Sequence, residues 1–234
     1  MVSASAQTRR LSSRRSALVN AVAATAFLIG GSLFAVGAAL AQAGVSTTAC
    51  ASVYLVGGVF FSTGGYSSVL QVVNEPSDPD GDPPRWRWWS REPRRLQWLS
   101  AVVLFAGTLV FAINLVDSFI AELSPTAEDR LVWSPDMVGC SLFLISGHLA
   151  LVEIGGGRRF WRHRDLGWWI VGVNQIGSAL FMVAAVASFV EPASAEAVNI
   201  GVANWGTLTG ALCFAIAGLM QEFEHPLGPR RRRT

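Results

Sequence analysis

Long stretches without a charged side chain alternate with short arginine-rich segments along the 234 residues of this chain. No charge occurs in residues 16–74, a run of 59 residues that is long enough for two membrane-spanning helices of about 20 residues each. A polar break at residues 42–48 divides the run. We therefore expect one helix over residues 17–41 and a second over residues 50–73.

Four further apolar segments predict four further spans. Three contain no charged residue at all: 96–116, 166–190 and 197–221. The remaining segment is shorter, because only 16 residues between Asp136 and Glu153 lack charge. We expect its helix to begin near Trp133, with Ser134-Pro135-Asp136 acting as N-cap, first helical residue and a carboxylate at the positive end of the helix dipole.

The arginines orient these six spans. The chain has 18 arginines and no lysine, and 17 arginines fall on one side of a six-helix count: residues 9, 10, 14, 15, 85, 87, 91, 94, 95, 158, 159, 162, 164 and 230–233. Only Arg130 falls on the other side. Because basic residues stay in the cytoplasm, both termini are predicted to be cytoplasmic in a multi-pass protein of the cell membrane.

One alternative concerns the N-terminus. Ser13-Arg14-Arg15 precedes an apolar run that ends in Ala39-Leu40-Ala41, as in a twin-arginine signal with a small-residue cleavage site. The run of about 25 residues is long for the apolar part of such a signal. A retained helix is therefore favoured over a cleaved one.

A glycine and phenylalanine pattern repeats along the chain. The second, fourth and sixth predicted helices share Gly-x-x-x-Phe-x-x-x-Gly: Gly57, Phe61, Gly65; Gly139, Phe143, Gly147; Gly210, Phe214, Gly218. The first, third and fifth share Gly-x-x-x-Phe: Gly30, Phe34; Gly107, Phe111; Gly177, Phe181. A polar residue follows the last glycine of each longer motif by six positions: Gln71, Glu153 and Glu224. Such self-similarity indicates one two-helix unit present three times.

The spacing of four places these residues on one face of each helix. Lipid supplies no hydrophobic drive for helix association, so close backbone contact at glycine is expected to supply it, with phenylalanine filling the adjacent space. A pore or hinge is the alternative role for such a glycine stripe. The predicted fold class is all-α, with six transmembrane helices in three tandem hairpins around a pseudo-threefold axis along the membrane normal.

This organisation divides the chain into seven segments. They are an Arg-rich cytoplasmic tail (1–16), hairpin 1 (17–73), a cytoplasmic loop (74–97), hairpin 2 (98–154), a basic loop (155–165), hairpin 3 (166–221) and a basic tail (222–234). Mitochondrial carriers are also built from three repeats of two helices, but their Pro-x-acidic-x-x-basic signature is absent from this sequence. That family is therefore rejected.

Three segments resemble the YrhK-like bacterial membrane proteins. They are residues 98–114, the stretch Trp133-x-Pro135-Asp136-x-x-Gly139-x-x-x-Phe143, and Asn174-x-x-Gly177-Ser178-x-x-Phe181. The resemblance covers residues 17–222, and the chain departs from it at Cys140, where the signature suggests serine. It implies an integral membrane protein built from two-helix units with a Gly-Ser and Phe signature. It implies no established activity, so no functional residues follow from it.

Polar side chains inside a span are candidate sites, because they are costly in lipid. His148 is predicted to lie past the middle of its helix, at a depth similar to Asn174 and Gln175, where proton exchange beside two amides is conceivable chemistry. Asn114 and Asp117 lie toward the opposite side of the membrane. The alternative for all five is structural: an interhelical hydrogen bond worth about 1 kcal/mol, or hydration at a helix end.

The remaining chemistry is sparse. Cys50 and Cys140 fall near the outer helix ends, where a disulfide is one alternative and small apolar packing the other. The cysteines and histidines lack metal-ligand spacing, so neither a metal nor another cofactor is predicted. No nucleophile or phosphate-loop motif is present, and the longest loop has only about 24 residues. We therefore predict a protein that is not an enzyme.

Two loops combine arginine with tryptophan. This collar consists of Arg85, Trp86, Arg87, Trp88, Trp89, Arg91, Arg94, Arg95, Trp161, Arg162 and Arg164. Tryptophan prefers the headgroup level of a bilayer, and each arginine attracts anionic lipid by about 1 kcal/mol. A specific lipid or protein partner is one hypothesis and general anchoring is the other, while the net charge of only +2 argues against nucleic acid. The sequence thus favours a structural or accessory membrane protein. The alternative is a small transporter or channel, proton-coupled or not, along the pseudo-threefold axis.

Overall fold

A computed structural model of the chain describes residues 4–75, 85–120, 123–155 and 165–224. The long helices in these ranges are α1 (Ala4–Gln42), α2 (Thr47–Val73), α3 (Leu96–Asp117), α5 (Ser134–Gly155), α6 (Leu166–Ala187) and α7 (Ile200–Glu222). The short α4 (Pro125–Glu128) and the π-helical turn η1 (Asp129–Trp133) lead into α5. The strands β1 (Val190–Glu191) and β2 (Glu196–Ala197) form a two-stranded antiparallel hairpin between α6 and α7.

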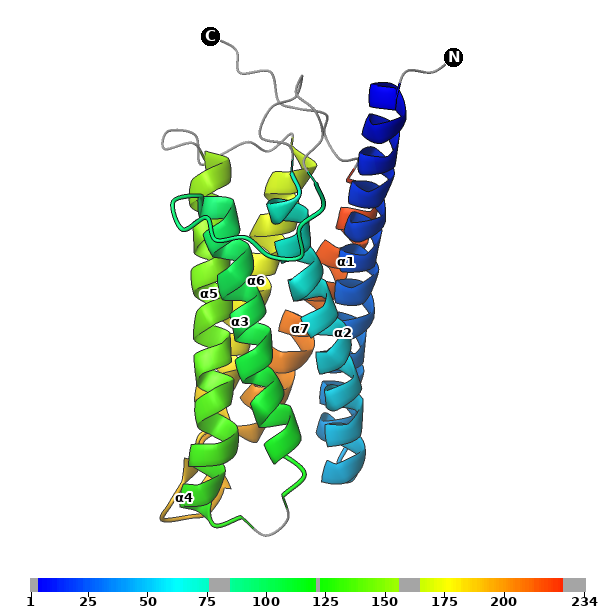
Figure 1. The fold of residues 1–234 in the computed structure, drawn as a ribbon. Helices are drawn as coiled ribbons and strands as arrows, with labels where there is room; N and C mark the ends of the chain where they lie inside the picture. Colours follow the sequence, from blue (N-terminus) through cyan, green and yellow to red (C-terminus); the bar gives the residue numbers. More distant parts are fainter. Residues whose placement is uncertain (1–3, 76–84, 121–122, 156–164, 225–234) are drawn as a thin grey trace.

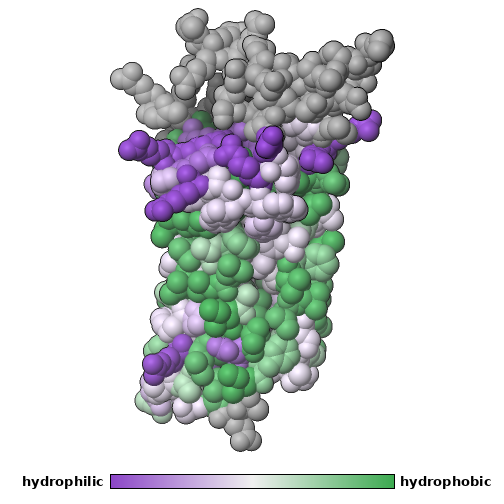
Figure 2. Space-filling view, in the orientation of Figure 1, coloured by the Kyte–Doolittle hydropathy of each residue, from purple (hydrophilic) through white to green (hydrophobic). Residues whose placement is uncertain are grey.

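Six of the helical segments in the described ranges are long and apolar enough to cross a membrane. The shortest of the six long helices, α3, α5 and α6, have 22 residues each, which at 1.5 Å per residue gives about 33 Å, slightly more than the hydrocarbon thickness of a bilayer. Large apolar side chains are exposed along these helices, and Figure 2 shows a mainly hydrophobic flank. The protein is a multi-pass membrane protein of the all-α class, as predicted.

The six long helices close into a ring. Each packs against the long helix before it and the one after it, and α7 returns to pack against α1. Helix α1 begins and α7 ends at the same end of the bundle, which we call the terminal end; the opposite one is the far end (Figure 1). The first and last helices are therefore neighbours, although they are separated by most of the sequence.

Phenylalanine fills the centre of the ring, with one ring from each long helix. Phe34, Phe111 and Phe181, from α1, α3 and α6, contact one another at centroid distances of 5.7–6.3 Å. A second triangle with distances of 5.1–6.3 Å joins the phenylalanines of α2, α5 and α7: Phe61, Phe143 and Phe214.

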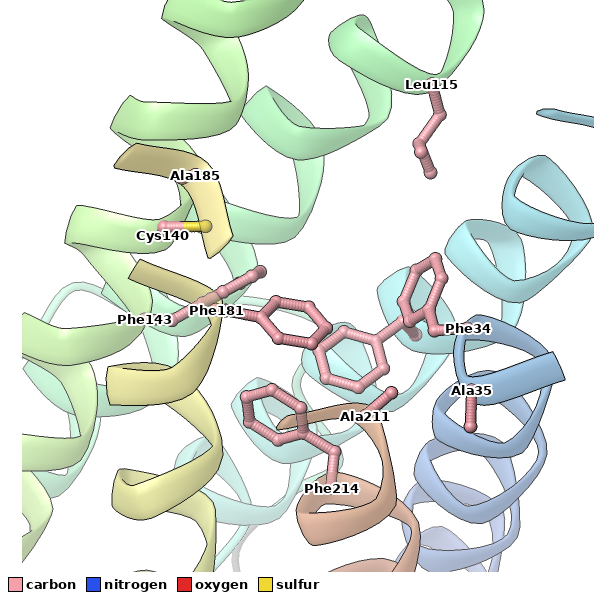
Figure 3. Close-up of a cluster of buried hydrophobic side chains, with 10 residues drawn as sticks. Phe34, Ala35, Leu115, Cys140, Phe143, Phe181, Ala185, Ala211 and Phe214 are labelled. Carbon is pink, nitrogen blue, oxygen red and sulfur yellow. The ribbon is translucent and has the colours of Figure 1, made fainter. Parts of the chain in front are cut away.

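The two phenylalanine triangles are stacked. Each hairpin links them through its own pair of rings, at 5.6 Å for Phe34 and Phe61 and at 5.1 Å for Phe181 and Phe214. Figure 3 shows four of these rings converging from different helices. Aromatic side chains thus occupy the axis of the bundle at this level, which we call the phenylalanine layer.

Glycine allows the helices of each hairpin to approach closely. A Cβ atom added to Gly30 in α1 would lie only 2.9 Å from the Gly57 carbonyl oxygen in α2. In the third hairpin, a Cβ on Gly177 would lie equally close to the Gly210 oxygen. A Cβ on Gly139 would lie 3.3 Å from a backbone oxygen of α3. These glycines therefore serve the packing role that the sequence favoured.

The fourth span begins earlier than predicted, which is a correction to its N-terminus. Ser124 is the N-cap, since its side chain accepts a hydrogen bond from Ala127 N–H, and Pro125 opens the helix. Ser134 does not begin the span, because its N–H donates to the carbonyl of Asp129 five residues back. A proline ring clashes with the carbonyl four residues before it, and a widened π turn precedes Pro135 here, so the helix continues through it.

Other boundaries also differ, most of all at the start of the first helix. Helix α1 begins at Ala4, so the predicted tail continues the first span as helix. Residues 188–190 lie beyond the end of α6, and β1 with its hairpin partner covers part of the far end. There Trp133 Nε1 donates to the Ala185 carbonyl at 2.7 Å, and the Trp133 ring packs on Phe189. These long-range contacts hold the connection after α6 against η1.

We expect Gly30→Ala to destabilise the bundle. The added methyl group would contact the backbone of α2, and overpacking costs about 1–3 kcal/mol. That cost outweighs the gain of up to about 1 kcal/mol in helix propensity. Gly172→Ala is the matched control, since its Cβ would meet only a tryptophan edge at 3.9 Å. Equal unfolding free energies for the two variants in detergent would contradict this role.

Candidate functional site

The predicted polar site within the membrane does not form one cluster. His148 is exposed on the outside of α5, whereas the neighbouring Gly147 faces α6. The Gln175 side chain of α6 fills the notch at Gly147, with its Nε2 donating weakly to the Leu144 carbonyl at 3.4 Å. Its buried Oε1 has no hydrogen-bond partner within the described residues. Asn174 is half-buried on the preceding position of α6.

Asn114 and Asp117 lie at a different level from His148. Ser100 and Ser146 exchange reciprocal hydrogen bonds of 2.9 Å between α3 and α5, and these bonds mark the level of His148. Asn114 lies 14 residues further along α3, a rise of about 21 Å. It is buried near the far end, and the half-buried Asp117 is the last residue of its helix. The five candidates therefore fall at two levels of the bundle, three near the Ser100–Ser146 contact and two near the far end.

Polar contacts that the sequence did not predict join α1, α2 and α7 near the terminal end. Asn20 Oδ1 accepts hydrogen bonds from Gln71 Nε2 at 2.8 Å and from Gln221 Nε2 at 3.1 Å. Thr25 also donates to Glu222 across α1 and α7. The signal in the sequence was an isolated amide near the cytoplasmic end of each of three predicted spans. Interhelical hydrogen bonds of this kind support association in lipid.

The part of the collar at residues 85–95, the collar loop, is clamped onto the end of α2. Asn74, directly after α2, is buried. Its Nδ2 donates to the Arg87 carbonyl and its Oδ1 accepts from the Arg87 N–H, each at 2.8 Å. It also bonds back to the Leu70 carbonyl. Tyr66 donates its hydroxyl to the Trp88 carbonyl at 3.2 Å. Two side chains of α2 thus set the path of the loop over its own helix end.

Contacts from α3 complete the clamp. Trp98 is buried, and its Nε1 donates to the Ser90 carbonyl at 2.9 Å. Arg95 donates to the Val72 carbonyl at 2.9 Å and forms ion pairs with Glu75 and Glu92. A hydrogen bond from Ser90, together with Arg95, lowers the pKa of Glu92, so this carboxylate stays charged at neutral pH. Arg95 is therefore committed to holding the loop.

The clamp leaves other collar residues pointing outward. Four arginines are exposed, and none forms an ion pair with a residue in the described ranges: Arg85, Arg87, Arg91 and Arg94. Trp88 and Trp89 are 67% and 52% exposed, while Trp86 is half-buried. Figure 2 shows a hydrophilic band around the terminal end above the hydrophobic flank. Trp161, Arg162 and Arg164 lie outside the described residues.

The cysteines and metal ligands form no reactive centre in the part of the chain that the structure describes. All three cysteines are free, with Cys50 and Cys140 buried, so the disulfide alternative is not realised. Cys140 Sγ lies 3.6 Å from the Asp136 carboxylate, one turn away on α5. Among the described residues, no three histidine, cysteine or acidic side chains gather as a metal site would need.

No protein-family profile, curated protein or solved structure matches the chain.

Asn74→Ala should release the collar loop while leaving the bundle intact. It removes two hydrogen bonds to Arg87, worth about 1 kcal/mol each. Amide exchange in residues 85–95 is therefore expected to accelerate by roughly 30-fold. Ser68→Ala, which deletes a bond within α2 only, is the control. Unchanged exchange in Asn74→Ala would mean that the clamp does not hold the loop.

Proposed function

We propose that the protein is a non-enzymatic structural or accessory protein of a bacterial plasma membrane, belongs with the YrhK-like proteins, and has both termini in the cytoplasm. Its working surface is the collar, which binds anionic lipid headgroups. A protein partner on the same surface is the second hypothesis for the collar. The outward display of four arginines and two tryptophans by a clamped loop is the observation that carries this proposal.

Charge separation between the two ends supports the proposed orientation. Each charged residue is assigned to one end of the bundle by the predicted tail or loop that contains it. The terminal end then has 17 arginines and nine carboxylates, a net charge of +8. One arginine and seven carboxylates belong to the far end, a net charge of −6. An excess of arginine in short loops stays on the cytoplasmic side, where the leaflet is also negatively charged.

The clamp also reduces the cost of binding. Ordering a loop and its side chains when a ligand arrives opposes affinity, and a loop already held in place avoids part of that cost. Arginine presents several donors that match phosphate oxygens, and indole rings prefer the headgroup level. Exposed Arg87 and Trp88 lie on the clamped backbone, so they are presented at a constant place relative to α2.

The phenylalanine layer favours this proposal over a transporter or channel along the axis. A path there needs polar groups or water at every level, because charge in hydrocarbon is costly. Phe34, Phe61 and Phe143 are 2–3% exposed at the centre of the ring. The candidate polar residues are divided between two levels of the bundle, and His148 faces outward.

Replacing the four exposed arginines 85, 87, 91 and 94 by glutamine should abolish selection of anionic lipid. The wild-type protein, purified from bilayers of equal phosphatidylglycerol and phosphatidylcholine, is expected to retain more phosphatidylglycerol. Its enrichment should also fall at high salt, which screens the arginines. Arg130→Gln, a change of the same kind at the far end, should keep the enrichment. The same enrichment in the fourfold variant would exclude the lipid role and leave the partner hypothesis.

A further inference from the structure

A groove runs along the junction between α2 and α3, where the first hairpin meets the second. Its volume is about 440 Å³, within the range of small-molecule sites in proteins. Six residues that line it are Leu55, Ser62 and Tyr66 on α2 and Phe105, Ala112 and Leu115 on α3. Val59, also in its wall, is 62% exposed, so the groove opens sideways to the exterior of the bundle.

The junction between α2 and α3 is packed mainly through side chains, which leaves the groove beside them. Between α7 and α1, a Cβ on Gly218 would lie 2.7 Å from the Leu28 nitrogen, so backbone meets backbone. Between α5 and α6, the Gln175 side chain fills the space beside Gly147. Between α2 and α3, a Cβ on Gly58 would meet the Leu115 side chain, and one on Gly65 would lie 3.3 Å from the Thr108 side chain. The small Ser62 and Ala112 leave room nearby.

The length of the groove is close to the hydrocarbon depth of one leaflet, and the groove is centred on the middle of α2. Eleven residues separate Leu55 from Tyr66, which corresponds to about 16 Å along the helix. Half of the hydrocarbon thickness of a bilayer is about 15 Å. The Thr63 hydroxyl donates to the Val59 carbonyl of its own helix, so that part of the wall presents mainly its methyl group to a ligand. An apolar chain would leave no polar group of Thr63 unpaired.

The end of the groove lies directly below the collar loop. Tyr66 lines this end, and its hydroxyl bonds to the Trp88 carbonyl. Asn74 fixes the neighbouring Arg87 backbone, and the Arg87 side chain is exposed. A phosphate above Tyr66 would therefore meet an exposed arginine beside the aromatic ring of Trp88. Charge at one end and an apolar channel below it are complementary to a phospholipid.

We propose that the groove between α2 and α3 binds one acyl chain of an anionic phospholipid whose headgroup lies at Arg87 and Trp88. This assignment rests on the lipid role proposed for the collar and adds a single defined site to it. The bound lipid fills the groove at this junction of the ring. It thereby attaches the second hairpin to the first on the side that faces the collar loop.

Ser62→Phe fills the groove without changing the collar and is the principal test. Native mass spectrometry of the full chain in mild detergent, with dioleoyl phosphatidylglycerol added, is expected to show one tightly retained lipid on the wild type. Ser62→Phe should lose it. Val56→Phe places the same side chain on an exposed position of α2 outside the groove, and it should retain the lipid.

Ala112→Leu on the opposite wall provides a second variant should Ser62→Phe fail to fold, and it should also lose the lipid. Retention of the lipid by a folded groove variant would overturn the proposal. Equal retention of dioleoyl phosphatidylcholine by the wild type would overturn it as well, because the site would then not distinguish an anionic headgroup from a zwitterionic one. Loss of anionic selection only in the fourfold arginine variant, with groove variants unaffected, would leave the collar function standing without the groove site.

Discussion

Close contact between helix backbones is the constraint on which the rest of the structure depends. Lipid chains are as apolar as leucine, so burying leucine between helices gains nothing over leaving it in the bilayer. Helices must instead gain dispersion contacts by approaching more closely than side chains normally allow. Gly30 against Gly57, and Gly177 against Gly210, provide this approach within the first and third hairpins. Gly218, later in α7, allows the same close backbone contact with α1, and this contact closes the ring.

Ring closure also determines where polar chemistry can occur. The six helices surround one axis. In each closely packed helix a phenylalanine follows the contact glycine by one turn, as Phe34 follows Gly30. These phenylalanines point inward, and their rings fill the centre. Polar contacts between helices are left to the two ends, as in the Asn20 cluster, and to isolated pairs such as Ser100 and Ser146. The largest display of charge in the described ranges then falls on the loop that α2 and α3 clamp over the terminal end.

The spans and their packing residues could be predicted because each is a local property of the sequence. Absence of charge over 21–25 residues and glycine at a spacing of four need no knowledge of distant contacts. The start of the fourth span was missed, because Ser134-Pro135 is typical of a helix start. The π-helical turn η1, which lets the helix continue through Pro135, has no comparable signal in the sequence. The outward direction of His148 was also missed, although the stripe of Gly139, Phe143 and Gly147 marks the packed face of α5 and His148 lies about 100° around the helix from Gly147.

The clamp on the collar loop depends on contacts that sequence spacing does not show. Asn74 reads as an ordinary residue at a helix end, yet its side chain pairs with a backbone 13 residues away. Likewise, five arginines look equivalent in the sequence, whereas Arg95 is bound internally by Glu75 and Glu92. Only the folded arrangement separates the arginine that builds the surface from those that are exposed on it.

The closed ring is tested most directly by the distance between the far ends of α1 and α7, where Asn204 donates to Gln42 at 3.1 Å. Spin labels at Gln42→Cys and Asn204→Cys, in a chain without its native cysteines, would report this distance by double electron–electron resonance. Neighbouring helices lie about 8–10 Å apart between axes, so we predict one narrow distribution at short distance. Six helices in an open row would separate α1 from α7 by five such spacings, roughly 45 Å, and a distribution there would contradict the account.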